Sequence, residues 1–153
     1  MNVCVGGTFS PLHKGHKELL RTAFQTAGAT GSVFIGVTSP AMIKKKGTIA
    51  SFQKRKQAIE QFLIEEKILR KATIQPIRTK FGPAVTGEFD AIIVTSETAP
   101  TAKEINRKRS QRGKPPLQII VIPFVLSEDG APIRSSRIRQ KEIDENGRVL
   151  KQE

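Results

Sequence analysis

The feature that most constrains the fold of this 153-residue chain is a series of short, nearly continuous apolar runs rich in β-branched residues. They span residues 2–6, 32–38, 72–77, 90–96 and 118–125. Runs of this length and composition are typical of strands buried on both faces of a parallel sheet. Helical patterns lie between or after them, at residues 16–28, 51–66, 98–113 and 134–143.

This alternation predicts an α/β protein with a single doubly wound, Rossmann-like domain, a five-stranded parallel sheet and helices on both faces. A chain of this length suits one domain, and no repeat or linker divides it, so we expect one domain over 1–153. The tail, 145–153, is expected to be loosely ordered. The single cysteine, Cys4, lies in an apolar run and is predicted to be a core residue.

The charge of the chain points to anionic ligands. The 26 Lys plus Arg and 14 Asp plus Glu residues give a net charge of +12, which attracts nucleic acid, anionic lipid or small phosphates alike. The basic residues are spread over several segments, and Phe is the only aromatic residue. We therefore expect no specific nucleic-acid partner, although a basic nucleic-acid-binding module is the alternative from another class. The sequence shows no secretory leader or membrane-spanning run, which favours a cytoplasmic protein without a membrane partner. It does not indicate the oligomeric state.

The segment "GGTFSPLHKGH", residues 6–16, follows the first apolar run. In an open α/β sheet this loop lies at the carboxyl end of a strand, where ligands bind. Its glycines allow a phosphate to approach the backbone, and the next helix directs its amides toward anions. Its two histidines, His13 and His16, are the only ones in the chain. Placed three apart at a helix start, they can face the same side and hydrogen-bond a phosphate, with a positive charge near neutral pH.

This segment resembles the signature of the nucleotidylyltransferase superfamily. The resemblance implies that Thr8 and His16 hold the α-phosphate of a nucleotide and the attacking phosphate through the transition state. It also assigns nucleotide contacts to Gly7, Phe9 (through its amide), His13 and Gly15. Ser10 stands where the superfamily usually has an aspartate that braces the loop, so we expect the bracing to be weaker or made differently.

A second segment, "IRSSRIRQKEID" at 133–144, carries two serines suited to begin a helix and three arginines. It resembles the Ile-Ser-Ser-Thr-x-x-Arg motif of the same superfamily, with an arginine in place of the first serine. The resemblance implies that this segment clasps the β- and γ-phosphates through Arg134, Ser135, Ser136, Arg137 and Arg139. We expect it to meet the first loop in space, although the two are far apart in the sequence.

The middle of the chain, with "IGVTSPAMIKKKG" (35–47), "PIRTKFGPA" (76–84) and the stretch 92–122, narrows the family. From Val3 to Gly147 the chain resembles the archaeal and eukaryotic-like branch of the pantetheine-phosphate adenylyltransferases. That resemblance implies adenylyl transfer from ATP to 4′-phosphopantetheine in coenzyme A biosynthesis. Mg²⁺ would be held mainly by the ATP phosphates, with no protein metal ligands. Flavin-dinucleotide synthetases, nicotinamide-mononucleotide adenylyltransferases and cytidylyltransferases share the two motifs and remain alternatives.

The same resemblance assigns the remaining site residues. Lys44, the first of three consecutive lysines, would hold the acceptor phosphate together with Thr8, and Gly82 and Pro83 would shape the pocket for the pantetheine arm. Arg55 begins its helix where the superfamily often has an arginine, with a structural role as the alternative. Contacts to the adenosine or closure over the nucleotide are assigned to Thr95, Ser96, Glu97, Thr98, Asn106 and Arg107.

Overall fold

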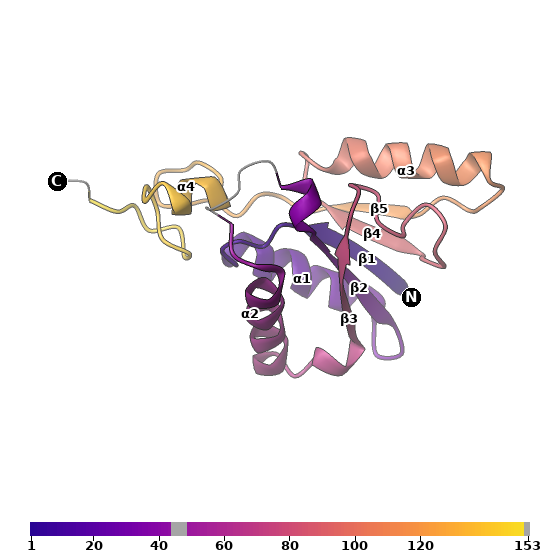
Figure 1. Ribbon diagram of the computed structural model, residues 1–153, viewed down its shortest axis with the longest axis horizontal. Helices are drawn as coiled ribbons and strands as arrows, with labels where there is room; N and C mark the ends of the chain where they lie inside the picture. Colours follow the sequence, from indigo (N-terminus) through magenta and orange to yellow (C-terminus); the bar gives the residue numbers. More distant parts are fainter. Residues whose placement is uncertain (44–48, 152–153) are drawn as a thin grey trace.

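The computed structural model describes residues 1–43 and 49–151. Their centre is one parallel sheet with the strand order β3-β2-β1-β4-β5, which confirms the predicted α/β fold (Figure 1). The strands are β1 (Asn2–Gly7), β2 (Ser32–Thr38), β3 (Ala72–Ile77), β4 (Ala91–Val94) and β5 (Gln118–Val121). The helices are α1 (Lys14–Ala27), α2 (Phe52–Glu65), α3 (Ala99–Gln111) and α4 (Ser135–Arg139), with short 3₁₀ turns η1 (Pro40–Met42) and η2 (Leu69–Lys71).

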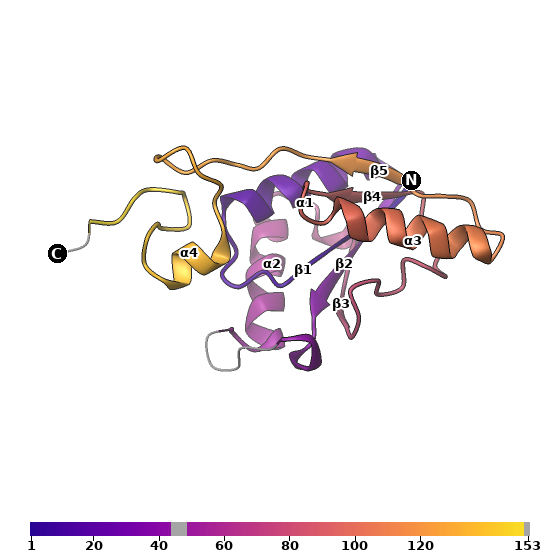
Figure 2. The same cartoon turned by 90° about the horizontal axis from the view of Figure 1, so that it is seen from above.

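Helices cover both faces of the sheet, as the alternation of the sequence predicts (Figure 2). Successive residues of a strand point to opposite faces, so Val3 and Val5 of β1 pack in the core beneath α1 and α2. Cys4, between them, points to the other face and joins a second core beneath α3. Cys4 is a buried free thiol, as expected of a core residue.

The central and edge strands differ in burial. All four residues of β4 are buried, whereas β5 has no buried residue and β3 has two, because each edge strand has a neighbour on one side only. The prediction that every run is buried on both faces was therefore wrong for the edges. The last two strands are also shorter than predicted. The ladder of β5 stops after the Ile122 amide donates to the Val94 carbonyl, because the next residue, Pro123, has no amide proton. The ladder of β4 stops at Thr95, because its amide donates to the Thr98 hydroxyl.

The C-terminal segment folds beside the start of α1. Helix α4 ends at Arg139, short of the predicted 143, and Lys141 then adopts a positive φ of 63°. Ile143 is buried and pairs with Val149, and the amide of Lys14 donates to the Glu145 carbonyl at 3.0 Å. The segment after β5 thus returns to the carboxyl end of β1. Among the helices described, none combines the length and apolarity needed to cross a membrane.

Candidate active site

A cavity of about 520 Å³ opens at the carboxyl ends of the central strands, where the strand order reverses between β1 and β4. Ligands bind at such reversal points in open α/β sheets. Both segments singled out in the sequence reach it, so the expected convergence is observed. The lining includes Gly7, Thr8, His13, Gly15, His16, Thr95, Glu97, Thr98, Arg134, Ser135, Ser136 and Arg139.

The two histidines form the cap of α1. His13 is the N-cap residue, and its Nδ1 accepts the amides of Gly15 (3.0 Å) and His16 (3.3 Å). In return, Nδ1 of His16 accepts the His13 amide at 3.3 Å, and the rings stack with centroids 3.7 Å apart. Because each Nδ1 is an acceptor, each neutral ring carries its proton on Nε2. The cap therefore gives both rings one defined tautomer, with Nε2–H as the donor.

The charge expected on these imidazoles is not what the structure supports. Burial lowers the pKa of His13 from 6.5 to about 4. Burial, and then the neighbouring His13, lower the pKa of His16 from 6.5 to about 3. Both rings are neutral at pH 7 in the ligand-free protein, because charging them would cost solvation. They offer hydrogen bonds to a phosphate rather than a standing positive charge.

The loop that replaces the usual aspartate by Ser10 is braced from behind by Arg55. This guanidinium is almost wholly buried and donates to the carbonyls of Thr8 (3.1 Å), Thr38 (2.8 Å) and Ala50 (2.9 Å). Ser10 accepts the Ala50 amide through Oγ at 3.1 Å. The bracing is therefore made differently, by an arginine with backbone partners, and Arg55 joins the loop after β1 to the end of β2.

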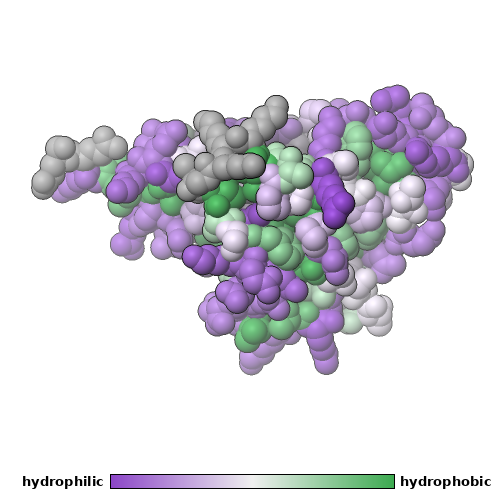
Figure 3. Space-filling model, viewed as in Figure 1, coloured by the Kyte–Doolittle hydropathy of each residue, from purple (hydrophilic) through white to green (hydrophobic). Residues whose placement is uncertain are grey.

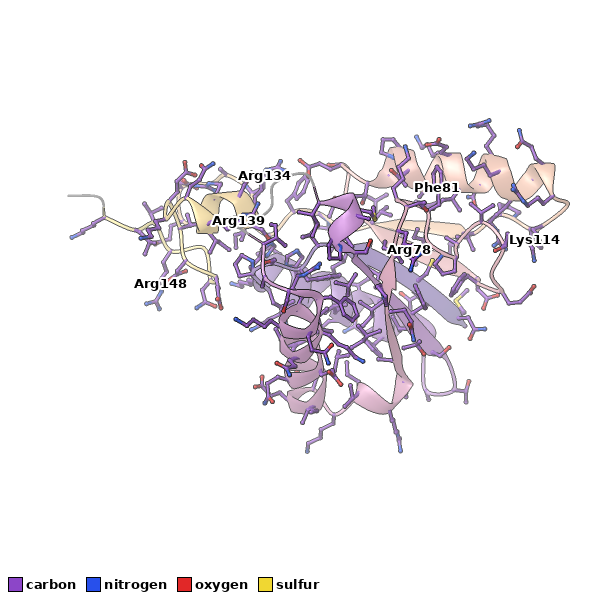
Figure 4. The ribbon with its side chains drawn as sticks, viewed as in Figure 1. Arg78, Phe81, Lys114, Arg134, Arg139 and Arg148 are labelled. Carbon is purple, nitrogen blue, oxygen red and sulfur yellow. The ribbon has the colours of Figure 1, made fainter. Side chains whose placement is uncertain are left out.

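The second motif docks directly on the first loop. Ser135 Oγ donates to the Pro11 carbonyl at 3.4 Å, and Arg139 donates to the Ser10 carbonyl at 2.5 Å, across more than 120 residues of sequence. Arg134 pairs with Glu97 from the loop after β4, and its guanidinium lies 5.1 Å from the Phe124 ring centroid. Figure 4 shows Arg134 at the start of α4, Arg139 at its end and Arg148 farther along the tail. Arg139 thus reaches the loop that carries the histidines.

A smaller, mostly apolar cavity of about 200 Å³ adjoins the first one beneath α3. The two cavities share Gly7, Thr38 and Thr98 among their lining residues. Gly82 and Pro83, assigned to the pantetheine arm, line the smaller cavity together with Phe81 (Figure 4). On this side of the molecule, hydrophobic side chains show between α3 and the C-terminal segment (Figure 3).

Glycines keep this cavity open. A Cβ on Gly36 would lie 2.8 Å from Cγ2 of Ile77, and one on Gly82, whose φ is +50°, would lie 2.9 Å from the same atom. Side chains at these positions would have to displace Ile77. A cavity that carries phosphate-binding groups, joined to a mostly apolar one, suits a molecule that has a phosphate at one end and an uncharged chain at the other.

Four assigned residues lie elsewhere. Asn106 exchanges two hydrogen bonds with the backbone of Leu117, at 2.9 and 2.7 Å, so its amide is occupied in holding α3 to the segment before β5. Arg137 bonds Asp129, Glu142, Ser127 and the Pro132 carbonyl, which binds it into the C-terminal segment. Ser96 and Arg107 are exposed and line neither cavity.

Phe9 and Lys44 were also assigned to the site. The side chain of Phe9 is buried, and φ at Phe9 is 54°, while its ring lies 4.9 Å from that of His16. The role given to its amide stays a prediction. Lys44 and the two lysines after it lie outside the described residues.

Thr38 is a site residue that the sequence reasoning missed. Its hydroxyl donates to that of Thr8 at 3.2 Å, and it lines both cavities. The signal was available, because β2 neighbours β1 in a parallel sheet and their carboxyl ends lie at the same edge. The segment 35–47 contains Thr38, but only Lys44 was assigned from it.

The donor groups of the site are those that bind phosphates. Hydroxyls, imidazoles and arginines face the larger cavity, and the only carboxylate among its described lining residues is Glu97, which pairs with Arg134. In residues 1–43 and 49–151, no three His, Cys, Asp or Glu side chains gather as metal ligands would. A doubly wound sheet with this donor set at its reversal point fits a nucleotidyltransferase.

Comparisons with known proteins give the family. The cytidylyltransferase-like family model matches residues 4–141. "Phosphopantetheine adenylyltransferase" of Methanosarcina acetivorans is 41% identical over 151 residues, covering 98% of this chain and 96% of that protein. The protein of the same name from Methanothermobacter thermautotrophicus is 42% identical and covers 97% and 89%. The chain belongs to the phosphopantetheine adenylyltransferase family, within the cytidylyltransferase-like proteins.

Solved structures agree in fold. A protein of unknown function from Archaeoglobus fulgidus superposes with a TM-score of 0.70 at 32% identity, covering 80% of this chain and 89% of that one. A bifunctional NMN adenylyltransferase/ADP ribose pyrophosphatase from Francisella tularensis gives a TM-score of 0.61 at 21% identity. It covers 92% of this chain and 41% of that one, and it supports the fold alone.

Proposed function

We propose that this protein transfers the adenylyl group of ATP to 4′-phosphopantetheine, giving dephospho-coenzyme A and pyrophosphate. The observation that carries the proposal is the pair of adjoining cavities. One is lined by residues of both phosphate motifs, and a smaller, mostly apolar one adjoins it at Thr38. The archaeal relatives at about 40% identity carry the name of this activity. A cytoplasmic setting stays a prediction.

In this reaction an oxygen of the acceptor phosphate attacks the α-phosphorus of ATP, and the bond from that phosphorus to the β-phosphate oxygen breaks. The nucleophile is already an anion, so no protein base is required. The protein has to bring two anions together and stabilise the charge that grows on the α-phosphate and on pyrophosphate.

We assign these tasks by position. His16 Nε2–H is a neutral donor for the α-phosphate oxygens, held in one tautomer by the cap of α1. The hydroxyl of Thr8 positions the acceptor phosphate, and Arg134 and Arg139 hold the departing pyrophosphate. A buried neutral donor discriminates in favour of the transition state, because its hydrogen bond strengthens as charge develops on the oxygen it faces.

Mg²⁺ fits this site as an ion bound to the triphosphate of ATP. The larger cavity offers hydroxyls and cations, with one carboxylate that is already paired, so the phosphate oxygens would be its ligands. When bound, Mg²⁺ would neutralise part of the phosphate charge. The chain's own residues would then orient the ATP.

The activity is tested by pyrophosphate release from ATP and Mg²⁺ with 4′-phosphopantetheine as acceptor. We expect turnover with this acceptor and background release with flavin mononucleotide or nicotinamide mononucleotide, or with CTP in place of ATP. Release that depends on one of those other substrates instead would assign the chain to a different nucleotidyltransferase activity.

The role of His16 is tested with two variants. In H16N, the amide oxygen can still accept the His13 amide, whereas H16A loses both that acceptor and the Nε2–H donor. We expect both to lower kcat at least ~10²-fold, the scale for one transition-state donor, and only H16A to lose ~1 kcal/mol of stability. Near-normal turnover in H16N would remove the imidazole from the chemistry.

A further inference from the structure

A further cavity lies outside the candidate active site. It is a groove of about 710 Å³ on the other side of the loop 9–12, between α2 and the C-terminal segment. We call it the rear groove. Its lining includes Lys17 of α1, Lys54, Ala58 and Phe62 of α2, and Arg139 of α4. Its volume is within the ~300–1,000 Å³ of typical small-molecule sites. Figure 1 shows the two flanking elements, α2 and α4.

The lining of the rear groove combines an apolar surface with an excess of cations. Leu12, Phe62 and Ile138 contribute apolar surface. The charged lining residues are four cations and two carboxylates, a net charge of +2: Lys17, Lys54, Arg55, Arg139, Glu65 and Glu145. Among the ion pairs of the described residues, none involves any of these six. This surface complements a molecule with an apolar body and an anionic group.

Hydrogen bonds join the rear groove to the nucleotide loop. Arg139 lines both cavities and donates to the Ser10 carbonyl, which belongs to the wall between them. Arg55 lines the rear groove and donates to the Thr8 carbonyl. Thr8 itself lines the 520 Å³ cavity of the candidate active site, which we call the front cavity. An anion in the rear groove would therefore contact groups that set the position of the phosphate-binding loop.

We propose that the rear groove is a second ligand site, which binds a small organic anion with an apolar body. Its ligand weakens triphosphate binding, because one Arg139 cannot direct its charge to both cavities at once. The antagonism rests on the proposed function, because that function assigns Arg139 to the triphosphate. The existence of the second ligand site does not rest on the proposed function. The triphosphate in turn weakens ligand binding in the rear groove, since linkage between two sites is reciprocal.

The site is tested with anilinonaphthalene sulfonate, an apolar anion whose fluorescence rises on burial, titrated into the protein without substrates. The chain has no Trp and no Tyr, so background emission is low. We expect saturable binding with one strong site, weakened about five- to twenty-fold in K54E, where an attraction becomes a repulsion. The matched control is K56E, which makes the same charge change on α2 outside the groove lining and should bind as the wild type does.

A steric pair of variants makes the test independent of charge. A58W places an indole in the rear groove and should abolish strong binding, whereas Q57W, one residue away and outside the lining, should not. Neither Lys54 nor Ala58 lines the front cavity, so pyrophosphate release by K54E and A58W should match the wild type. Binding that is unchanged in both K54E and A58W, or undetectable in the wild type up to millimolar probe, would overturn the proposal.

The antagonism is measured with tripolyphosphate by calorimetry. Saturating probe should raise the dissociation constant of tripolyphosphate at least ~5-fold in the wild type, the lower end of typical coupling, and leave it unchanged in A58W. An unchanged constant in the wild type would refute the coupling through Arg139. Failure of the proposed function would instead appear as absent pyrophosphate release, an assay in which no probe is present.

Discussion

Acidification from pH 7 to pH 5 should destabilise this protein through its two histidines. Both have pKa values lowered by burial, to about 4 for His13 and about 3 for His16. In the unfolded chain both return toward 6.5 and take up protons below that pH. The unfolded state then binds more protons than the folded state, so the free energy of unfolding falls as pH falls below 6.5. The loss continues until pH reaches the folded pKa values.

The magnitude follows from the two pKa values of each ring. Between pH 7 and pH 5, a histidine that titrates at 6.5 only in the unfolded chain lowers the free energy of unfolding by ~1.9 kcal/mol. The pair together gives ~3.7 kcal/mol, a large share of the ~5–15 kcal/mol of a typical domain. Carboxylates with ordinary pKa values near 4 contribute little above pH 5, so this window isolates the histidines.

Urea unfolding at several pH values between 5 and 7 measures the effect. The midpoint should fall with pH at a constant slope against denaturant, which shows that the compactness of the two states is unchanged. A double variant, H13N with H16N, keeps acceptors at both cap positions and should lose most of the pH dependence. A wild-type midpoint that does not move, or a double variant that still follows the wild-type curve, would refute the assignment of two neutral buried rings.

Three further predictions concern the surroundings of the site. G36A should raise the KM for 4′-phosphopantetheine several-fold and leave that for ATP unchanged, because the new Cβ meets Ile77 Cγ2 at 2.8 Å; adding I77A, which removes that atom, should restore it, and an equal rise for ATP would count against the arm cavity. R55K should cost ~2–3 kcal/mol in urea unfolding and lower kcat/KM, since one ammonium cannot span three carbonyls; wild-type values for both would contradict the brace. N106A should lose ~1–2 kcal/mol with kcat and the KM for ATP unchanged, because its amide bonds only Leu117; a weakened ATP interaction would restore its nucleotide role.

The strands and the convergence of the motifs could be predicted because they depend on general rules. Apolar runs with β-branched residues bury themselves in a parallel sheet, and carboxyl ends of parallel strands share one edge. The order of elements placed His16 at that edge, whereas Ser135 was placed beside it through the resemblance of its segment to the superfamily motif. The exact strand ends did not follow, because they depend on single contacts such as the Thr95 amide meeting the Thr98 hydroxyl.

The misplaced residues share a different cause. Asn106 and Arg137 have the same side-chain chemistry as nucleotide-binding residues, but each satisfies backbone or carboxylate groups close to it in sequence. Chemistry alone cannot separate these uses, since amides and guanidiniums serve both. What separates them is whether the local backbone leaves groups unpaired, and that is visible only once Leu117 and Pro132 have positions.

Ser10 departs from the superfamily motif in its charge, and Arg55 lies behind the same loop. An aspartate at this position would add a negative charge to the loop, whereas serine adds none. With serine there, Arg55 bonds to carbonyls and hydroxyls, and none of the described acidic side chains pairs with it. Burial lowers its pKa, yet an arginine stays charged near neutrality. Its positive charge therefore remains beneath Thr8, where a phosphate would lie, and supplies part of the attraction that the neutral histidines do not.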